Sequence, residues 1–203
     1  MNIYLDLDGT LINIKNRHYM LYHDMCVKSG GKPLSLEKYW DIRRGRGVWI
    51  EILKLSKISQ SIEKFALDFS NDIESQKYLK HNELFDYTLP TLKKLTNQNN
   101  LYLVTLRQNK KNLLKELNTF GLTTFFKEIL SSGDNKTNLI SMTNFTKNDI
   151  VVGDTEIDIF AAKELGLASI AVLSGIRNKE FLQTLSPTLI LPTVELLPDV
   201  FKK

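Results

Sequence analysis

The chain has 203 residues, of which 42% are hydrophobic and 25% are charged, and these fractions are close to globular averages. A chain of this length buries a substantial core without disulfides, and it permits one domain or one domain with an insert. The net charge is +4 and the pI is about 9.0, but the Lys and Arg residues are scattered apart from Arg43-Arg44-Gly45-Arg46 and the Lys202-Lys203 tail. Because nucleic-acid-binding proteins usually gather their basic residues into a stripe, we expect anionic small molecules rather than nucleic acid as partners.

The cysteine content and the length of the apolar runs indicate in which cellular compartment we expect the protein. The single cysteine, Cys26, excludes an internal disulfide and fits a reducing compartment. The chain starts with a polar-flanked strand pattern rather than the charged region and long apolar stretch of a signal peptide. No apolar run approaches the roughly 20 residues that a membrane-spanning helix needs. We therefore expect a cytoplasmic protein with no membrane partner, and the sequence leaves monomer and homodimer open.

The first predicted element is a strand at Asn2–Asp6, and the stretch from about Lys15 to Asp86 that follows it contains no convincing strand. The stretch predicts helices at Arg17–Ser29, Ser35–Arg43, Val48–Leu55 and Ser59–Leu79. It is too long for an ordinary loop. We therefore expect residues 15–86 to form an inserted helical cap, joined through linkers near Ile12–Lys15 and His81–Asp86.

From residue 87 onward, short apolar runs alternate with helical patterns, which predicts parallel β-α units. The expected strands are Leu101–Thr105, Asp149–Gly153, Ala168–Leu173 and Thr188–Leu191. The expected helices are Thr88–Thr96, Lys110–Phe120, Lys136–Thr143, Ile157–Leu165 and Asn178–Thr184. Gly121 and Gly166 follow two of these helices, where a left-handed C-cap is favoured. The predicted fold class is α/β, with a parallel-sheet core of residues 1–14 and 87–203, helices on both faces, and the all-α cap.

Acidic residues stand at the carboxyl ends of the predicted strands, where open parallel sheets bind their ligands. Asp6 and Asp8 follow the first strand, Thr105 ends the second, and Asp154 with Asp158 follow the third. Four carboxylates in one crevice would repel one another unless a divalent cation held them, and oxygen ligands of this kind suit Mg²⁺. The sequence therefore predicts a magnesium site that binds a phosphorylated substrate.

The same residues predict a covalent mechanism. Asp6 can attack phosphorus as a carboxylate nucleophile, and Asp8 can protonate the leaving oxygen and then deprotonate water. That role needs a raised pKa for Asp8, which we expect from the neighbouring like charges. Thr105 offers a hydroxyl and a backbone amide to a phosphoryl oxygen, and a lysine is needed to offset the negative charge.

These motifs resemble the haloacid dehalogenase superfamily, in its phosphoglycolate phosphatase-like branch with a helical cap. Asp6-Leu7-Asp8-Gly9-Thr10-Leu11 resembles the first motif, Thr105 the second, and Gly153-Asp154-Thr155-Glu156-Ile157-Asp158 the fourth. The resemblance runs from end to end and implies a Rossmann-like core, an aspartyl-phosphate intermediate and Mg²⁺. It also implies that the Asp6 carboxylate, the Asp8 main-chain carbonyl and Asp154 ligate the metal, with Asp158 supporting the metal or the lysine.

The chain departs from the family pattern at two positions. Lys136 is our choice for the lysine of the third motif, although Thr137 follows it where the family often has proline. Lys147 is nearer to Asp154 but sits in the loop before the strand, where we expect it to face water. Arg107 stands where small or amide residues often follow the threonine, and it is either a substrate contact or a surface residue.

In the cap, Arg43, Arg44 and Arg46 flank Gly45 in a predicted inter-helix loop. They are candidates for binding an anionic part of the substrate, and the alternative is a solvated loop. We assign no role to His18, His23 and His81, which lack metal-binding spacing.

We expect a Mg²⁺-dependent phosphoric monoester hydrolase that acts on a small phosphorylated metabolite. A phosphotransferase or sugar-phosphate mutase would use Asp6 in the same way, and the sequence does not separate it from a hydrolase. A dehalogenase needs neither Mg²⁺ nor an acid at position 8. A non-catalytic interaction protein on the same scaffold would be expected to have lost one of the four acids, and all four are present.

Overall fold

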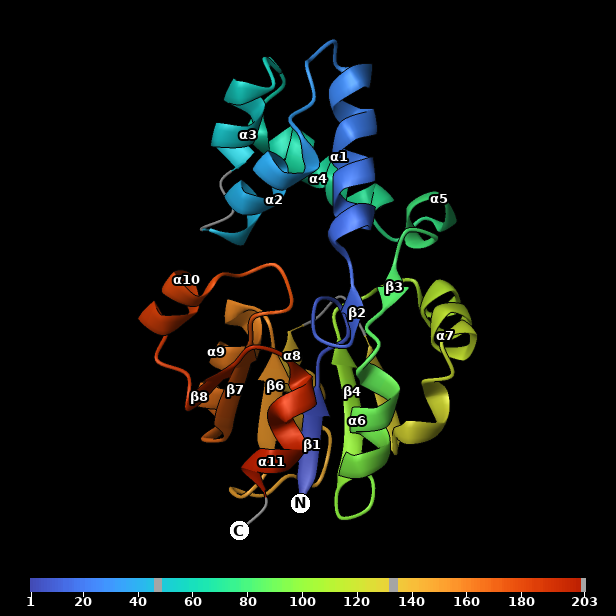
Figure 1. The fold of residues 1–203 in the computed structure, drawn as a ribbon, viewed down its shortest axis with the longest axis vertical. Coiled ribbons are helices and arrows are strands. Elements are labelled where there is room, and N and C mark those ends of the chain that lie inside the picture. Colours follow the sequence, from blue (N-terminus) through green and yellow to red (C-terminus); the bar gives the residue numbers. More distant parts are fainter. Residues whose placement is uncertain (46–48, 132–134, 202–203) are drawn as a thin grey trace.

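The structure is a computed structural model that describes residues 1–45, 49–131 and 135–201. Its core is a six-stranded sheet in the order β5-β4-β1-β6-β7-β8, and every neighbouring pair is parallel (Figure 1). The strands are β1 (Asn2–Leu5), β4 (Asn100–Thr105), β5 (Glu128–Ser131), β6 (Ile150–Gly153), β7 (Ala168–Val172) and β8 (Leu189–Leu191). The predicted α/β fold class with a parallel sheet is confirmed.

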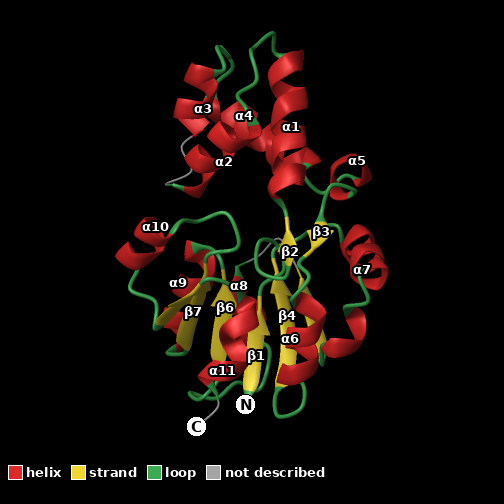
Figure 2. Ribbon diagram, viewed as in Figure 1, coloured by secondary structure: helices red, strands yellow, loops and turns green. Residues whose placement is uncertain are grey.

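Alternating side chains of the strands pack on opposite faces of the sheet. Ile3 and Leu5 of β1 join one buried cluster and Tyr4 joins another, as the two-residue period of a strand requires. On the first face pack α6 (Thr88–Leu95) and α11 (Leu197–Val200), and on the second α8 (Lys136–Ser141) and α9 (Glu156–Leu165) (Figures 1 and 2). Each fully buried leucine or isoleucine stabilises this packing by about 1.5–3 kcal/mol.

Serine and asparagine side chains fix the starts of several helices. Asn109 accepts from the backbone N–H of Asn112 at 3.0 Å at the start of α7 (Lys110–Thr119), and Asn135 accepts from that of Asn138 at 2.7 Å before α8. Asn178 does the same for α10 (Lys179–Thr184). Such N-caps satisfy donors that have no partner inside the helix.

The described helices α1 to α5 lie beyond the carboxyl ends of the strands (Figure 1). They are α1 (Lys15–Lys28), α2 (Leu36–Arg44), α3 (Trp49–Leu55), α4 (Ile62–Asp72) and α5 (Gln76–Leu79). The prediction of one helix over Ser59–Leu79 is wrong, because the chain turns at Ser75, whose N–H donates to the carbonyl of Asp72 and whose backbone is extended. Serine and aspartate compete for backbone hydrogen bonds and favour such breaks.

The two predicted linkers pair with each other. β2 (Ile12–Asn13) and β3 (Glu83–Leu84) form a two-stranded antiparallel ribbon that carries the chain into and out of the helical region. The prediction that the stretch from Lys15 to Asp86 holds no strand is therefore wrong at β3. Two residues cannot display the alternation by which a strand is recognised. The division at residues 14/15 and 86/87 stays a prediction.

Edge strand β5 was also missed. Its sequence, Glu128-Ile129-Leu130-Ser131, has only two apolar residues, and only Leu130 and Ser131 are buried.

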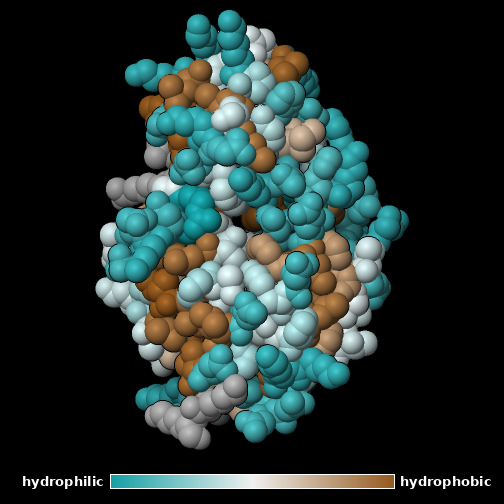
Figure 3. All heavy atoms as spheres, in the orientation of Figure 1, coloured by the Kyte–Doolittle hydropathy of each residue, from teal (hydrophilic) through white to brown (hydrophobic). Residues whose placement is uncertain are grey.

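The described residues contain no helix long and apolar enough to cross a membrane. On the face drawn in Figure 3, hydrophobic residues form separate patches with polar residues between them.

The two predicted glycine C-caps are confirmed, since Gly121 and Gly166 have φ of 67° and 68°. Gly166 has no atom within 4 Å of the position that a Cβ would take. Replacement therefore costs only the strain of a left-handed backbone.

We expect Gly166→Ala to lower the free energy of unfolding by about 1 kcal/mol, because alanine is strained in the left-handed region. Gly166→Asn should cost less, because asparagine tolerates this conformation. Urea unfolding of the three proteins measures both. Equal losses in the two variants would contradict the backbone explanation.

Candidate active site

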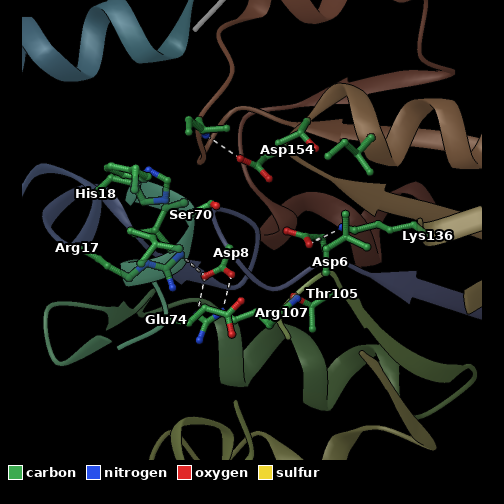
Figure 4. Close-up of a pocket in the computed structure, with 17 residues that line it drawn as sticks. Asp6, Asp8, Arg17, His18, Ser70, Glu74, Thr105, Arg107, Lys136 and Asp154 are labelled. Atoms are coloured by element: carbon green, nitrogen blue, oxygen red, sulfur yellow. Dashed lines mark hydrogen bonds and ion pairs between the residues drawn. The ribbon is translucent and has the colours of Figure 1, made fainter. Parts of the chain in front are cut away.

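The predicted site residues meet at the carboxyl edge of the sheet, around a cavity of about 310 Å³. Its floor contains Asp6, Asp8, Thr105, Lys136 and Asp154, from β4 and from the segments that follow β1, β5 and β6. β1 lies between β4 and β6, so the cavity stands where the strand order reverses direction, the usual position for a ligand. Residues of α1 and α4 form the opposite wall (Figure 4).

Lys136 joins two carboxylates at the floor. Its Nζ lies 2.5 Å from Asp6 Oδ1 and 2.6 Å from Asp158 Oδ1, and all three side chains are buried. Burial opposes the lysine charge, but Asp158 and Asp6 outweigh it and raise the pKa of Lys136. The lysine therefore stays charged on Asp6, whereas Lys147 is exposed.

Asp154 occupies space that glycines leave open. A Cβ on Gly9 would lie 2.4 Å from Asp154 Oδ2, and one on Gly175 would lie 1.9 Å from the same atom. Gly9 also has φ of 86°, which other residues seldom adopt. Asp154 Oδ2 accepts from the N–H of Ile176 at 2.6 Å, while Oδ1 is buried without a hydrogen-bond partner among the described residues.

The two carboxylates at the floor fit a cation. Burial raises the pKa of Asp6 to about 7, and burial together with Asp6 raises the pKa of Asp154 well above its ordinary value. Asp6 shares its lysine with Asp158, Asp154 has no ion pair among the described residues, and the unpaired Asp154 Oδ1 offers an oxygen ligand of the kind that Mg²⁺ prefers. These residues fit the metal that the resemblance implies.

The four predicted acids lie at the same edge of the sheet, and Asp158 contacts the lysine as the resemblance allows, but the four do not form one metal-binding set. Within residues 1–45, 49–131 and 135–201, no three acidic, histidine or cysteine side chains gather as a metal-binding set. The side chain of Asp158 turns to Lys136 and to the backbone N–H of Thr155, where it completes the capping box of α9. The side chain of Asp8 turns to arginines, which leaves Asp6 and Asp154 as the acids that face a cation.

Asp8 lies between two buried guanidinium groups. Arg107 donates from Nε to Asp8 Oδ2 and from Nη2 to Oδ1, both at 2.7 Å, and Arg17 donates from Nη2 to Oδ1 at 2.8 Å (Figure 4). Burial raises the pKa of Asp8, but Arg107 and Arg17 outweigh it and hold that pKa well below its usual range. The expectation of a raised pKa is wrong, because like charges are not the nearest groups.

Arg107 is fully committed to acids. Its third nitrogen, Nη1, lies 2.8 Å from Glu116 Oε2 on α7, and Asn82 Nδ2 donates to Glu116 Oε1 at 2.6 Å. Arg107 lines the cavity but is only 4% exposed. The structure therefore gives it contacts with Asp8 and Glu116 rather than with solvent, and its Nη1 contacts Glu116 as an ion pair without a hydrogen bond.

Comparison with known proteins shows the family to which this chain belongs. A family model described as haloacid dehalogenase-like hydrolase matches residues 3–172. The chain belongs to this family. No curated protein sequence matches the chain.

Solved structures with the haloacid dehalogenase-like fold cover nearly the whole chain. An inferred phosphatase from Clostridium difficile is 25% identical, with a TM-score of 0.75 and coverage of 98% of this chain and 97% of that one. A haloacid dehalogenase-like family hydrolase from Streptococcus pneumoniae is 19% identical, with a TM-score of 0.80 and coverage of 99% and 98%. An inferred hydrolase of the family from Bacillus subtilis, solved bound to magnesium, is 18% identical, with a TM-score of 0.68 and coverage of 100% and 98%.

In this haloacid dehalogenase-like chain, two of the predicted cap arginines, Arg43 and Arg44, are not among the described residues that line the cavity. The guanidinium of Arg43 lies over the Trp49 ring, 4.3 Å from its centroid. Arg44 donates from Nη2 to the carbonyl of Leu173 at 2.8 Å. Arg46 lies outside the described residues. Arg43 and Arg44 therefore contribute to packing and to contacts between helix α2 and the loop after β7.

Sequence reasoning missed Arg17 and His18, which line the cavity from the first turn of α1. Both are buried, and burial together with Arg17 lowers the pKa of His18 well below its ordinary value, so the imidazole is neutral. The only sequence signal was their position soon after the Asp6–Asp8 motif. Charged residues at a helix start usually face solvent, and only the packing of α1 over the strand ends turns them inward.

We expect Arg107→Met to lower the free energy of unfolding at pH 7 by about 3–5 kcal/mol, because it leaves buried carboxylates unpaired. The pKa of Asp8 is depressed in the folded state, so its pairs stabilise the fold above the unfolded pKa of about 3.9 and lose this effect as the pH falls through the folded value. In the variant that pKa rises, and the deficit relative to wild type should be smaller at pH 4 than at pH 7.

Urea unfolding at the two pH values provides this measurement. Arg44→Met is the matched control, because Arg44 hydrogen-bonds backbone carbonyls of Leu173 and Arg177, and its deficit should not change between pH 7 and pH 4. A deficit of Arg107→Met that is the same at both pH values would contradict the ion-pair account.

Proposed function

We propose that this protein is a Mg²⁺-dependent phosphatase that hydrolyses a small phosphorylated metabolite through a phosphorylated Asp6. The observation that carries the proposal is the buried Asp6 carboxylate, held by Lys136 beside the unpaired Asp154 Oδ1 at the floor of a cavity. The family and the likeness to an inferred phosphatase support the same activity.

Asp6 acts as the nucleophile. Lys136 holds Asp6 Oδ1, and the Thr10 hydroxyl donates to Oδ2 at 3.2 Å, so the carboxylate is fixed in one orientation. In the first step an Asp6 oxygen attacks phosphorus and the bond to the leaving oxygen breaks. In the second step water attacks the phosphorus and releases Asp6.

Lys136 and Thr105 stabilise the phosphoryl oxygens. The Thr105 hydroxyl oxygen accepts from the backbone N–H of Arg107 at 3.4 Å, which leaves its own proton to donate to substrate. Lys136 carries a positive charge beside the reacting oxygen in a buried site, where a fixed charge stabilises developing negative charge best.

Mg²⁺ would be held by the Asp6 and Asp154 carboxylates together with the Asp8 main-chain carbonyl. When bound, it offsets the negative charge of the carboxylates and of the substrate phosphoryl group. The relative solved bound to magnesium supports this choice of cation.

Asp8 is the proposed acid and base, and its two arginine pairs define what this role requires. A carboxylate whose pKa lies well below its usual range is not protonated at pH 7. To donate a proton to the leaving oxygen, Asp8 must weaken its pairs with Arg17 and Arg107. Arg17 belongs to α1 in the proposed cap, residues 15–86, whereas Arg107 follows β4. A small movement of the cap would therefore change the distance between Arg17 and Asp8 and leave the pair of Arg107 with Asp8 unchanged.

Asp6→Asn should abolish phosphate release, because an amide oxygen is a poor nucleophile, while the fold is retained. The measurement is phosphate release from a generic aryl phosphate and a panel of phosphorylated metabolites. Asp72→Asn, at an exposed position on α4, is the matched control and should retain activity. An active Asp6→Asn protein would refute the nucleophile assignment.

Removing the metal should also stop the reaction. EDTA should abolish phosphate release and Mg²⁺ should restore it, and Asp154→Asn should raise the Mg²⁺ concentration for half-maximal activity at least ~10-fold, since a ligand is lost. Activity that survives EDTA would overturn the metal assignment. Substrate consumption without phosphate release would favour phosphoryl transfer to a sugar hydroxyl.

A further inference from the structure

Arg17 has hydrogen-bonding capacity that the described protein does not use. Its side chain is 4% exposed, and only Nη2 is paired, with Asp8. Its Nε and Nη1 are buried and have no hydrogen-bond partner among the described residues. Buried donors without an acceptor are unusual, because buried polar groups are normally hydrogen-bonded, so these two nitrogens call for an acceptor that the described residues do not supply.

The other cations of the cavity are already occupied. Among its described lining residues the positive side chains are Arg17, Arg107 and Lys136. Lys136 contacts Asp6 and Asp158, and every nitrogen of Arg107 faces Asp8 or Glu116. Arg107 Nη1 makes no hydrogen bond but lies 2.8 Å from Glu116 Oε2, whereas Arg17 Nε and Nη1 have neither a hydrogen bond nor an ion pair among the described residues.

His18 adds a second unsatisfied polar atom at the same wall. Its Nδ1 is buried without a hydrogen-bond partner in the described part of the chain, and its ring packs against Trp40 and Phe69. Arg17 and His18 are adjacent on the first turn of α1 and both line the cavity, on the side of Asp8 away from Lys136 (Figure 4). The two residues form a polar spot, which we name the α1 subsite.

Hydrophobic residues form part of the lining of the cavity that the α1 subsite faces, beside the polar Ser70 and Glu74. They are Ile14, Phe69, Ile73, Leu106, Ile157 and Ile176. In such surroundings an arginine pairs with an anion far more strongly than it does in water. The volume of about 310 Å³ is near the lower end of the roughly 300–1,000 Å³ range of ligand pockets, so the occupant is small.

We infer that the α1 subsite binds a second anionic group on the substrate, carried by the part that leaves as the alcohol. The substrate class is then a small phosphate monoester with an additional carboxylate or phosphate, and Arg17 is the specificity-determining residue. This inference rests on the proposed function, since it assigns the transferred phosphoryl group to Asp6 and the second anion to Arg17.

The test compares phosphate esters of two- and three-carbon alcohols that end in a methyl group, a carboxylate or a second phosphate. For wild type, kcat/KM should be at least ~10-fold higher for an anionic ester than for its methyl counterpart. Arg17→Met should reduce this ratio by about 10- to 100-fold, the value of a charge-assisted hydrogen bond pair. Arg17→Lys should restore part of it, and the better of carboxylate and phosphate identifies the anion.

The ratio of kcat/KM for anionic and methyl esters distinguishes binding of the second anion by Arg17 from the contact that Arg17 makes with Asp8. If Arg17 only positioned Asp8, Arg17→Met would lower kcat/KM for all esters equally, and an unchanged ratio would overturn the inference. Arg44→Met removes an arginine that does not line the cavity, and its ratio should equal that of wild type. Circular dichroism of each variant verifies folding.

Binding to the Asp6→Asn protein provides a readout that does not require turnover. Isothermal titration calorimetry should show tighter binding of the anionic esters than of the methyl esters, and Arg17→Met in this background should remove the difference. Binding that depends on Arg17 without any hydrolysis by wild type would refute the proposed function and retain the anion subsite. Hydrolysis without preference for a second anion would refute the anion subsite and retain the proposed function.

Discussion

The pairing of buried charge at the carboxyl edge of the sheet is the constraint on which the site depends. Among the described residues, five acids take part in these pairs or lie beside them, Asp6, Asp8, Glu116, Asp154 and Asp158, and three cations face them, Arg17, Arg107 and Lys136. This set holds two more acids than cations. Burial, together with the neighbouring carboxylates, raises the pKa values of Asp6 and Asp154, and a divalent cation would offset their negative charge.

The charges divide into two groups with different partners. Asp6 and Asp158 pair with one lysine, while Asp154 has no ion pair among the described residues, so this group retains the unpaired oxygen that would hold a cation. Asp8 and Glu116 share two arginines and are fully paired. Two carboxylates that are separated by a single residue therefore have opposite pKa shifts, because their neighbours differ and not because their sequence positions differ.

The same arginines connect the helical region to the sheet. Arg17 of α1 and Arg107 after β4 meet on Asp8, and Glu74 accepts from the backbone N–H groups of Gln108 and Asn109. On the other side, Arg44 and Arg177 exchange contacts between the end of α2 and the loop after β7, and Arg177 also pairs with Glu156 on α9. Arg43 and Arg44, which the sequence made candidates for substrate binding, thus contribute to contacts between elements, whereas the buried Arg17, to which the sequence gave no role, lines the cavity.

The sequence by itself determined what depends on local periodicity and on short motifs. Apolar alternation and glycine C-caps such as Gly166 located most strands and helices after residue 87, and the Asp6–Thr10 motif located the site at the end of β1. The tertiary structure alone decided the edge strand β5, the β2–β3 pairing, the partners of Asp8 and the inward position of Arg17. Contacts such as Arg107 with Glu116 or Lys136 with Asp6 join residues that have no fixed spacing, and they exist only because parallel strands bring their carboxyl ends to one edge.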